Sequence, residues 1–108
     1  MSSVDWNRLH ELQADIGKED FLDVAMVFVA ELEETLSGMT AEAATADDFH
    51  FLRGSAANLG FTALVEACSQ AEARTKTGAL PDVDAVKSAF GQALTEMSAQ
   101  MPGLTIAA

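Results

Sequence analysis

Apolar residues recur at intervals of three and four along several segments of this chain, and this spacing constrains the fold more than any other feature. It places the apolar side chains on one face of an α-helix, whereas a half-buried strand would show a period of two. Tyrosine is absent and β-branched residues are scattered, so strands have little to build on. In the last such segment the stripe consists of Val83, Val86, Phe90, Leu94, Met97 and Met101.

The same spacing and the turn residues between segments predict where each helix lies. We expect helices over about 5–16, 19–37, 49–59, 61–75 and 81–101. Asp5 can cap the first helix, and Pro81 suits the first turn of the last. Residues 38–47 are either a loop or the early turns of the third helix. On the second helix the expected core stripe is Phe21, Ala25, Phe28, Leu32 and Thr35.

Amphipathic helices joined by short loops can bury their stripes only against one another. The predicted fold is therefore all-α, an antiparallel four-helix bundle with an additional short N-terminal helix. The 108 residues suffice for one core, so residues 1–108 are expected to form a single domain. Residues 102–108 are expected to be a frayed tail, and we expect a monomer.

The charge balance is strongly acidic, with 17 Asp and Glu against six Lys and Arg. A net charge of −11 repels nucleic acid and anionic membrane surfaces, which argues against both as partners. No apolar run approaches the ~20 residues that span a bilayer, and the charged N-terminus is unlike a signal peptide. The one cysteine, Cys68, has apolar neighbours, which predicts a buried and inert thiol in a reducing compartment. These features favour a cytoplasmic protein.

The third predicted helix carries a histidine on its outward face. At about 100° per residue, Phe49 and Leu52 fall on the core side, and His50 falls on the other. A lone histidine on a helix is usually a solvated side chain. Imidazole titrates near neutrality, however, so an exposed ring offers a neutral nucleophilic nitrogen at cellular pH. The neighbours of His50 decide between these two interpretations.

Three neighbours on the same face favour a functional histidine. Arg53 lies one turn away and could hold a phosphoryl group attached to the ring, although it could also balance Asp47 or Asp48. Gly54 lies within the helix, where glycine costs about 1 kcal/mol relative to alanine. Its missing side chain would let a partner approach the imidazole, unless it serves tight packing against a neighbouring helix. Ala57 continues this low strip.

The stretch from His50 to Gly60, HFLRGSAANLG, resembles the signature of the histidine phosphotransfer (HPt) family. That signature has a histidine, a basic residue three positions on, then glycine with small residues, and a Leu-Gly pair that closes the helix. Glu72 falls where the family often has an acidic residue. The chain departs from the pattern in two places: Arg53 stands where lysine is usual, and Phe49 where a small residue is common.

The resemblance implies that His50 accepts a phosphoryl group and exchanges it with an aspartate on a response-regulator receiver domain, and that Arg53 stabilises that group. It also implies a receiver or hybrid histidine kinase as partner. The receiver would supply the magnesium, so no cofactor or metal is expected on this chain. The chain would be a phosphocarrier without ATP-dependent kinase activity. The alternatives are a scaffold or inhibitor whose histidine is idle, and a histidine kinase fragment, for which nucleotide-binding motifs are lacking.

A receiver must dock around His50, so the sequence also raises the question of the docking surface. Gly54 and Ala57 give a flat strip on the third helix. On the second helix the apolar residues Leu22, Met26 and Val29 lie beside the expected core stripe. They could form an exposed patch next to His50. The alternative is that the first helix covers them, using Leu9 and Leu12.

Overall fold

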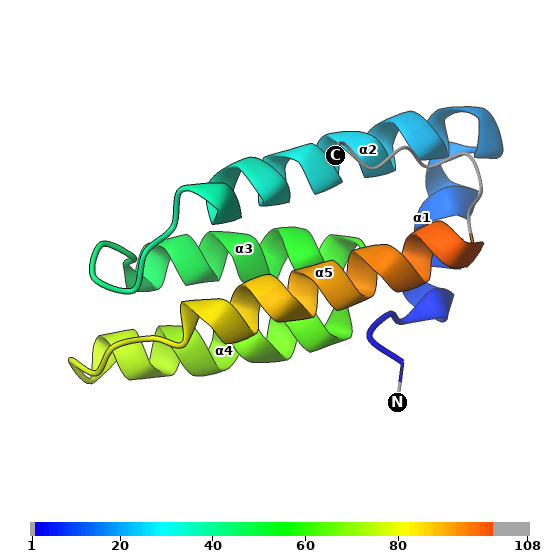
Figure 1. Cartoon of the computed structure of the whole chain (residues 1–108). Helices are drawn as coiled ribbons and strands as arrows, with labels where there is room; N and C mark the ends of the chain where they lie inside the picture. The colour runs from blue at the N-terminus through cyan, green and yellow to red at the C-terminus, as the bar shows by residue number, and fades with distance from the viewer. Residues whose placement is uncertain (1, 101–108) are drawn as a thin grey trace.

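The computed structural model describes residues 2–100, which form five α-helices and no strand. The helices are α1 (Trp6–Ile16), α2 (Lys18–Ser37), α3 (Ala46–Asn58), α4 (Thr62–Lys76) and α5 (Val83–Gln100). Figure 1 shows α2 to α5 running alternately in opposite directions, with α1 across one end of the bundle. The predicted antiparallel four-helix bundle with an additional short N-terminal helix is therefore confirmed. The predicted frayed tail, 102–108, lies outside the described residues.

Side chains at the N-termini of α1, α3 and α5 explain where these three helices begin. The Asp5 carboxylate accepts a hydrogen bond from the Arg8 N–H at 3.2 Å, which confirms it as the cap of α1. Thr45 and Asp48 form a reciprocal capping box, so α3 starts at Ala46 and 38–45 is a loop. Asp82 accepts a hydrogen bond from the N–H three residues on, at 2.9 Å. Pro81 therefore precedes the cap of α5, and its predicted place in the first helical turn is wrong.

One hydrophobic core joins all five helices. The ring centroids of Phe61 and Phe90 lie 6.4 Å apart, next to the turn that leads into α4. On α2 the buried side chains are Phe21, Ala25, Val29, Leu32 and Leu36. The stripe thus passes through Val29, whereas Phe28 is only partly buried. At 3.6 residues per turn the two positions straddle the stripe, and packing against the other helices selects one of them.

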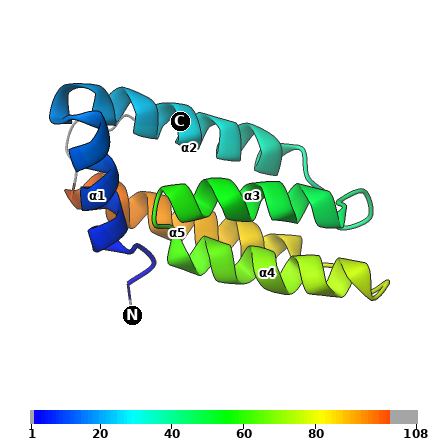
Figure 2. The ribbon, with the colours of Figure 1, turned by 180° about the vertical axis from the view of Figure 1, so that it is seen from behind.

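The turn between α3 and α4 holds these two helices close together. Gly60 has φ +71°, and a Cβ there would lie 2.6 Å from the Asp5 carbonyl oxygen, so only glycine fits. The Asp5 N–H donates a hydrogen bond to the Gly60 carbonyl at 2.6 Å, which ties the N-terminal segment to the turn. Figure 2 shows α3 and α4 side by side along their length. Residues on their shared flank can therefore meet.

Candidate functional site

The imidazole of His50 projects from the middle of α3 into solvent. Its side chain is 69% exposed, whereas Phe49 and Leu52 on the opposite face are fully buried. The outward direction expected from the helical angle is thus confirmed. The large Phe49 side chain fits within the core, so it does not displace His50 from the surface.

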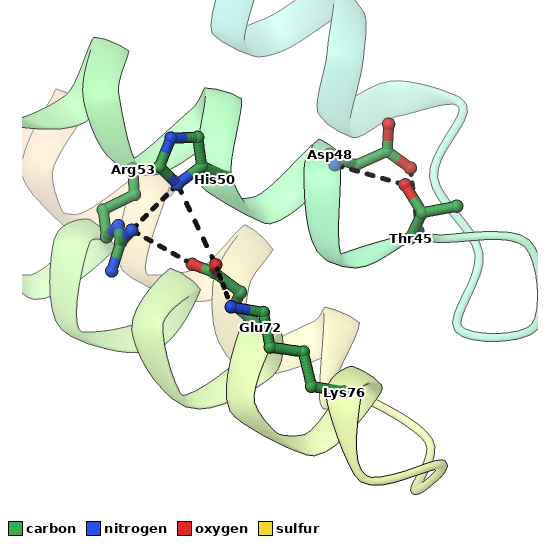
Figure 3. A network of polar contacts seen from close by, with 6 residues as sticks. All are labelled: Thr45, Asp48, His50, Arg53, Glu72 and Lys76. Atoms are coloured by element: carbon green, nitrogen blue, oxygen red, sulfur yellow. Dashed lines mark hydrogen bonds and ion pairs between the residues drawn. The ribbon is translucent and has the colours of Figure 1, made fainter.

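One ring nitrogen of His50 is engaged by neighbouring side chains, and the other is not. The Arg53 Nη2 lies 2.9 Å from His50 Nδ1, and Glu72 Oε2 lies 3.8 Å from the same nitrogen. Figure 3 shows the second ring nitrogen on the far side of the ring from both groups. Because a guanidinium can only donate hydrogen bonds, the contact with Arg53 requires a lone pair on Nδ1. A neutral ring in this arrangement therefore carries its proton on Nε2.

Glu72 is the carboxylate at the centre of this group. It lies on α4, and only 10% of its side chain is exposed. The Arg53 Nη2 lies 3.3 Å from Oε1, and the Lys76 Nζ lies 3.1 Å from Oε2. The hydrogen bond from Lys76 and the charge of Arg53 hold the pKa of Glu72 below its usual range, against the opposing effect of desolvation. Glu72 is therefore a carboxylate at neutral pH.

Arg53 pairs with other groups than those expected of an ordinary surface arginine at this position. The sequence left open whether Arg53 balances Asp47 or Asp48. In the structure Asp48 belongs to the capping box of α3, and Arg53 contacts His50 and Glu72 instead. Figure 3 shows the capping box and the His50 group as two separate sets of contacts on the same helix. The guanidinium is therefore beside the imidazole, where an anion attached to the ring would meet it.

Gly54 and Ala57 lie on the exposed face of α3, as the helical angle predicts. A Cβ added at Gly54 would have no atom within 4 Å apart from its own helix and chain neighbours. Packing against a neighbouring helix thus does not explain this glycine. The surface next to His50 is low and open.

The second half of the predicted docking surface needs a correction. Val29 is 7% exposed and belongs to the core, so it cannot line a surface patch. Leu22 and Met26 are half-buried. The structure instead exposes half of Phe51, the residue after His50, which the sequence analysis did not single out. Leu9 of α1 is buried, and Leu12 packs against the core.

Glu72 and Lys76 were not among the predicted site residues, although the sequence contains a signal for Glu72. Glu72 follows Leu64 by eight residues and Cys68 by four along α4, on the face that enters the core. A carboxylate on a buried face needs a cationic partner. Lys76 lies one turn further on, and Arg53 is the cation that the neighbouring helix offers. Glu72 and Lys76 lie close to His50 because of the register of α3 against α4, and this register is seen only in the packed structure.

Little else in the described residues offers chemistry. Burial raises the pKa of Cys68 to about 12, so this buried thiol is neutral and unreactive at cellular pH, as predicted. Within 2–100, no three His, Cys, Asp or Glu side chains gather as a metal site would require. The helices in that range are all too short or too polar to cross a membrane. His10 is exposed on α1, and its neighbour Glu11 pairs with Arg8 at 3.6 Å.

Comparison with protein-family models gives a match to the Hpt domain over residues 18–100. The match covers more than two thirds of the chain and includes α2 to α5. Searches of curated proteins and of solved structures gave no significant match. The chain therefore belongs to the Hpt domain family, whose members are histidine phosphotransfer modules of phosphorelays rather than kinases, and which interact with receiver domains and kinases.

Proposed function

We propose that this protein is a phosphorelay intermediate that accepts a phosphoryl group on His50 and exchanges it with the aspartate of receiver domains. The observation that carries the proposal is the state of the imidazole: Nδ1 is engaged by Arg53 and faced by Glu72, while Nε2 is open to solvent. An idle surface histidine has no need of a guanidinium and a largely buried carboxylate on one ring nitrogen. The family match supports the same role.

Nε2 is the nitrogen that would form the bond to phosphorus. For attack Arg53 must leave Nδ1 and the ring proton must move from Nε2 to Nδ1, where it faces the Glu72 carboxylate. The Nε2 lone pair forms the N–P bond while the bond between phosphorus and the aspartate oxygen of the receiver breaks. The aspartate leaves as a carboxylate. Because the proton stays on Nδ1, the phosphorylated ring is an imidazolium, and Glu72 stabilises its positive charge. The reverse sequence of bond changes returns the phosphoryl group to an aspartate.

Arg53 would serve the phosphorylated state. A phosphoryl group carries nearly two negative charges at neutral pH, and a guanidinium can donate parallel hydrogen bonds to two of its oxygens. Arg53 Nη2 lies 2.9 Å from Nδ1 of the same ring, and Arg53 must leave this nitrogen to donate hydrogen bonds to a group on Nε2. Arginine keeps the charge that lysine usually supplies in this family.

The receiver would dock over the open face of α3. Gly54 and Ala57 leave room for its loops beside His50, and the half-exposed Phe51 adds an apolar contact. Leu22 and Met26 remain candidates for the edge of this surface, although both are half-buried. The receiver would contribute the aspartate and the magnesium ion. We further propose that the protein acts in the cytoplasm, as a monomeric single domain without ATP-dependent kinase activity.

Phosphorylation of purified variants tests the proposal. The chain is incubated with a phosphorylated receiver domain, and in parallel with ATP alone, and phosphate incorporation is followed by intact mass. We expect incorporation from the receiver, none from ATP, and complete loss in His50→Gln with an unchanged helical circular-dichroism spectrum. His10→Gln, which alters the other exposed histidine, is the matched control. Incorporation that persists in His50→Gln would contradict the assignment. A receiver that binds without transfer would favour the scaffold, and labelling by ATP would favour a kinase.

A further inference from the structure

Two cations share the carboxylate of Glu72, one on each oxygen. Arg53 Nη2 lies 3.3 Å from Oε1, and Lys76 Nζ lies 3.1 Å from Oε2. Arg53 comes from α3, whereas Lys76 comes from the same helix as Glu72, one turn further along it. In Figure 3 the Lys76 side chain extends along α4 and ends at the carboxylate. Two cations for one nearly buried carboxylate are more than its neutralisation requires.

The position of Arg53 poses a problem for the proposed function. Its Nη2 contacts both His50 Nδ1 and Glu72 Oε1, so Arg53 already has two partners before any phosphoryl group arrives. To hold a group on Nε2, Arg53 must turn away from the carboxylate. A carboxylate that is 10% exposed is destabilised when its cationic partner leaves, because few water molecules can replace it. The attraction of Glu72 would then hold Arg53 back from the phosphoryl group.

We propose that Lys76 is a positioning residue that keeps Glu72 neutralised, and thereby frees Arg53 to move from the carboxylate to the phosphoryl group on His50. Before transfer, Arg53 and Lys76 each hold one oxygen of Glu72. When the N–P bond forms on Nε2, Arg53 donates its hydrogen bonds to the phosphoryl oxygens. Lys76 remains on Oε2, and the proton on Nδ1 faces the same carboxylate. This inference rests on the proposed function of His50.

The rival explanation is that Lys76 contacts the phosphoryl group or the receiver directly. The two explanations differ in their dependence on Glu72. If Lys76 acts by neutralising Glu72, its loss has no effect once residue 72 carries no charge. If Lys76 acts directly, the loss has the same effect whether or not residue 72 is charged. Lys76→Met keeps the aliphatic stem of the side chain, and Glu72→Gln keeps the shape of the carboxylate.

The experiment is a double-mutant cycle on the full chain. His50 is phosphorylated with phosphoramidate, in which the P–N bond breaks and ammonia leaves, so that no receiver has to dock. The half-life of the phosphohistidine is then measured. We expect Lys76→Met to shorten it about fivefold in the wild-type background and less than about twofold in the Glu72→Gln background, as for residues of one ion-pair network. Lys76→Arg should restore the wild-type half-life. Lys18→Met removes a lysine from the first turn of α2 and should have no effect.

A second measurement follows Arg53 itself. In Lys76→Met without phosphate, Glu72 should hold Arg53 more tightly, so the hydrogens on its guanidinium should exchange more slowly in ¹⁵N-edited spectra. An equal loss of half-life in both backgrounds, or unchanged exchange at Arg53, would overturn the role of Lys76 while leaving His50 as phosphoacceptor. A chain in which His50 accepts no phosphoryl group would overturn the proposed function and this inference with it. Circular dichroism of each variant checks that the helices are intact.

Discussion

Two faces of the bundle each contain a glutamate with a lowered pKa and a glycine in the middle of a helix. On α3 and α4 these are Glu72 and Gly54, and on α5 they are Glu96 and Gly91. A Cβ at either glycine would meet no neighbouring atom. Judged by pKa direction and backbone alone, the two faces are similar. They differ in what surrounds each carboxylate.

Neutral donors surround Glu96, whereas cations surround Glu72. The Ser2 hydroxyl and the Ser3 N–H donate to Glu96, the latter at 2.9 Å, and these hydrogen bonds lower its pKa. They fasten the N-terminal segment to α5, and no histidine lies among them. Glu72 is instead paired with the charges of Arg53 and Lys76, and in our proposal Arg53 moves from it to a phosphoryl group while Lys76 stays. A lowered carboxylate pKa therefore does not by itself distinguish a candidate functional site from a structural contact, whereas the neighbouring cations and the exposed histidine do.

The largest expected difference between the two faces is the effect on phosphoryl transfer of a large side chain in place of each glycine. Gly54→Leu should slow transfer from a phosphorylated receiver at least about a hundredfold, because small displacements of reacting groups have effects of this size. Gly91→Leu, the matched control, should leave the rate unchanged. Phosphorylation of Gly54→Leu by phosphoramidate should remain normal, since that reagent needs no docking. A parental rate of receiver transfer in Gly54→Leu would mean that the docking surface lies elsewhere.

The next effect concerns the cation beside His50. Arg53→Ala should shorten the phosphohistidine half-life about tenfold, which corresponds to the loss of roughly one charge-assisted hydrogen bond. Arg53→Lys should change it by less than about twofold, because the charge remains. The half-life is read from intact mass after the phosphoryl donor is removed. An unchanged half-life in Arg53→Ala would return this residue to an ordinary surface role.

A smaller effect concerns stability, where the two faces should behave alike. Gly54→Ala and Gly91→Ala should each raise the free energy of unfolding by about 1 kcal/mol, because both positions are helical and open. Urea denaturation measures the change. If Gly91→Ala raised the free energy of unfolding and Gly54→Ala did not, the backbone at residue 54 would be subject to a constraint that the structure does not show.

The smallest effect concerns acidification of the N-terminal contact. The lowered pKa of Glu96 means that its stabilising contribution is present above the unfolded value of about 4.3 and is lost as the pH falls through the folded value. Glu96→Gln should therefore have a lower Tm than wild type at pH 7, and the difference should vanish on acidification. Phosphorylation of His50 should be unaffected. A Tm difference that grows towards low pH would contradict this assignment.

The helices and the outward direction of His50 could be predicted because both follow from local periodicity. A helix fixes the angle of every side chain about its axis, so the apolar stripe determines where residue 50 points. The helical angle alone did not decide which residues at the edge of an apolar stripe are buried. Val29 and Phe28 lie on either side of that edge on α2, and the prediction placed the wrong one in the core.

Local sequence patterns were sufficient to predict five helices, an exposed histidine with an arginine one turn away, and an open glycine beside them. The residues that complete the candidate site depend on tertiary packing. Glu72 and Lys76 reach His50 only through the register of α4 against α3, which the turn at Gly60 and the packing of both helices set. Periodicity is a property of one segment, whereas register depends on how two buried faces interlock. For this reason His50 was visible in the sequence as a candidate phosphoacceptor, whereas the contacts that Glu72 and Lys76 make beside it were not.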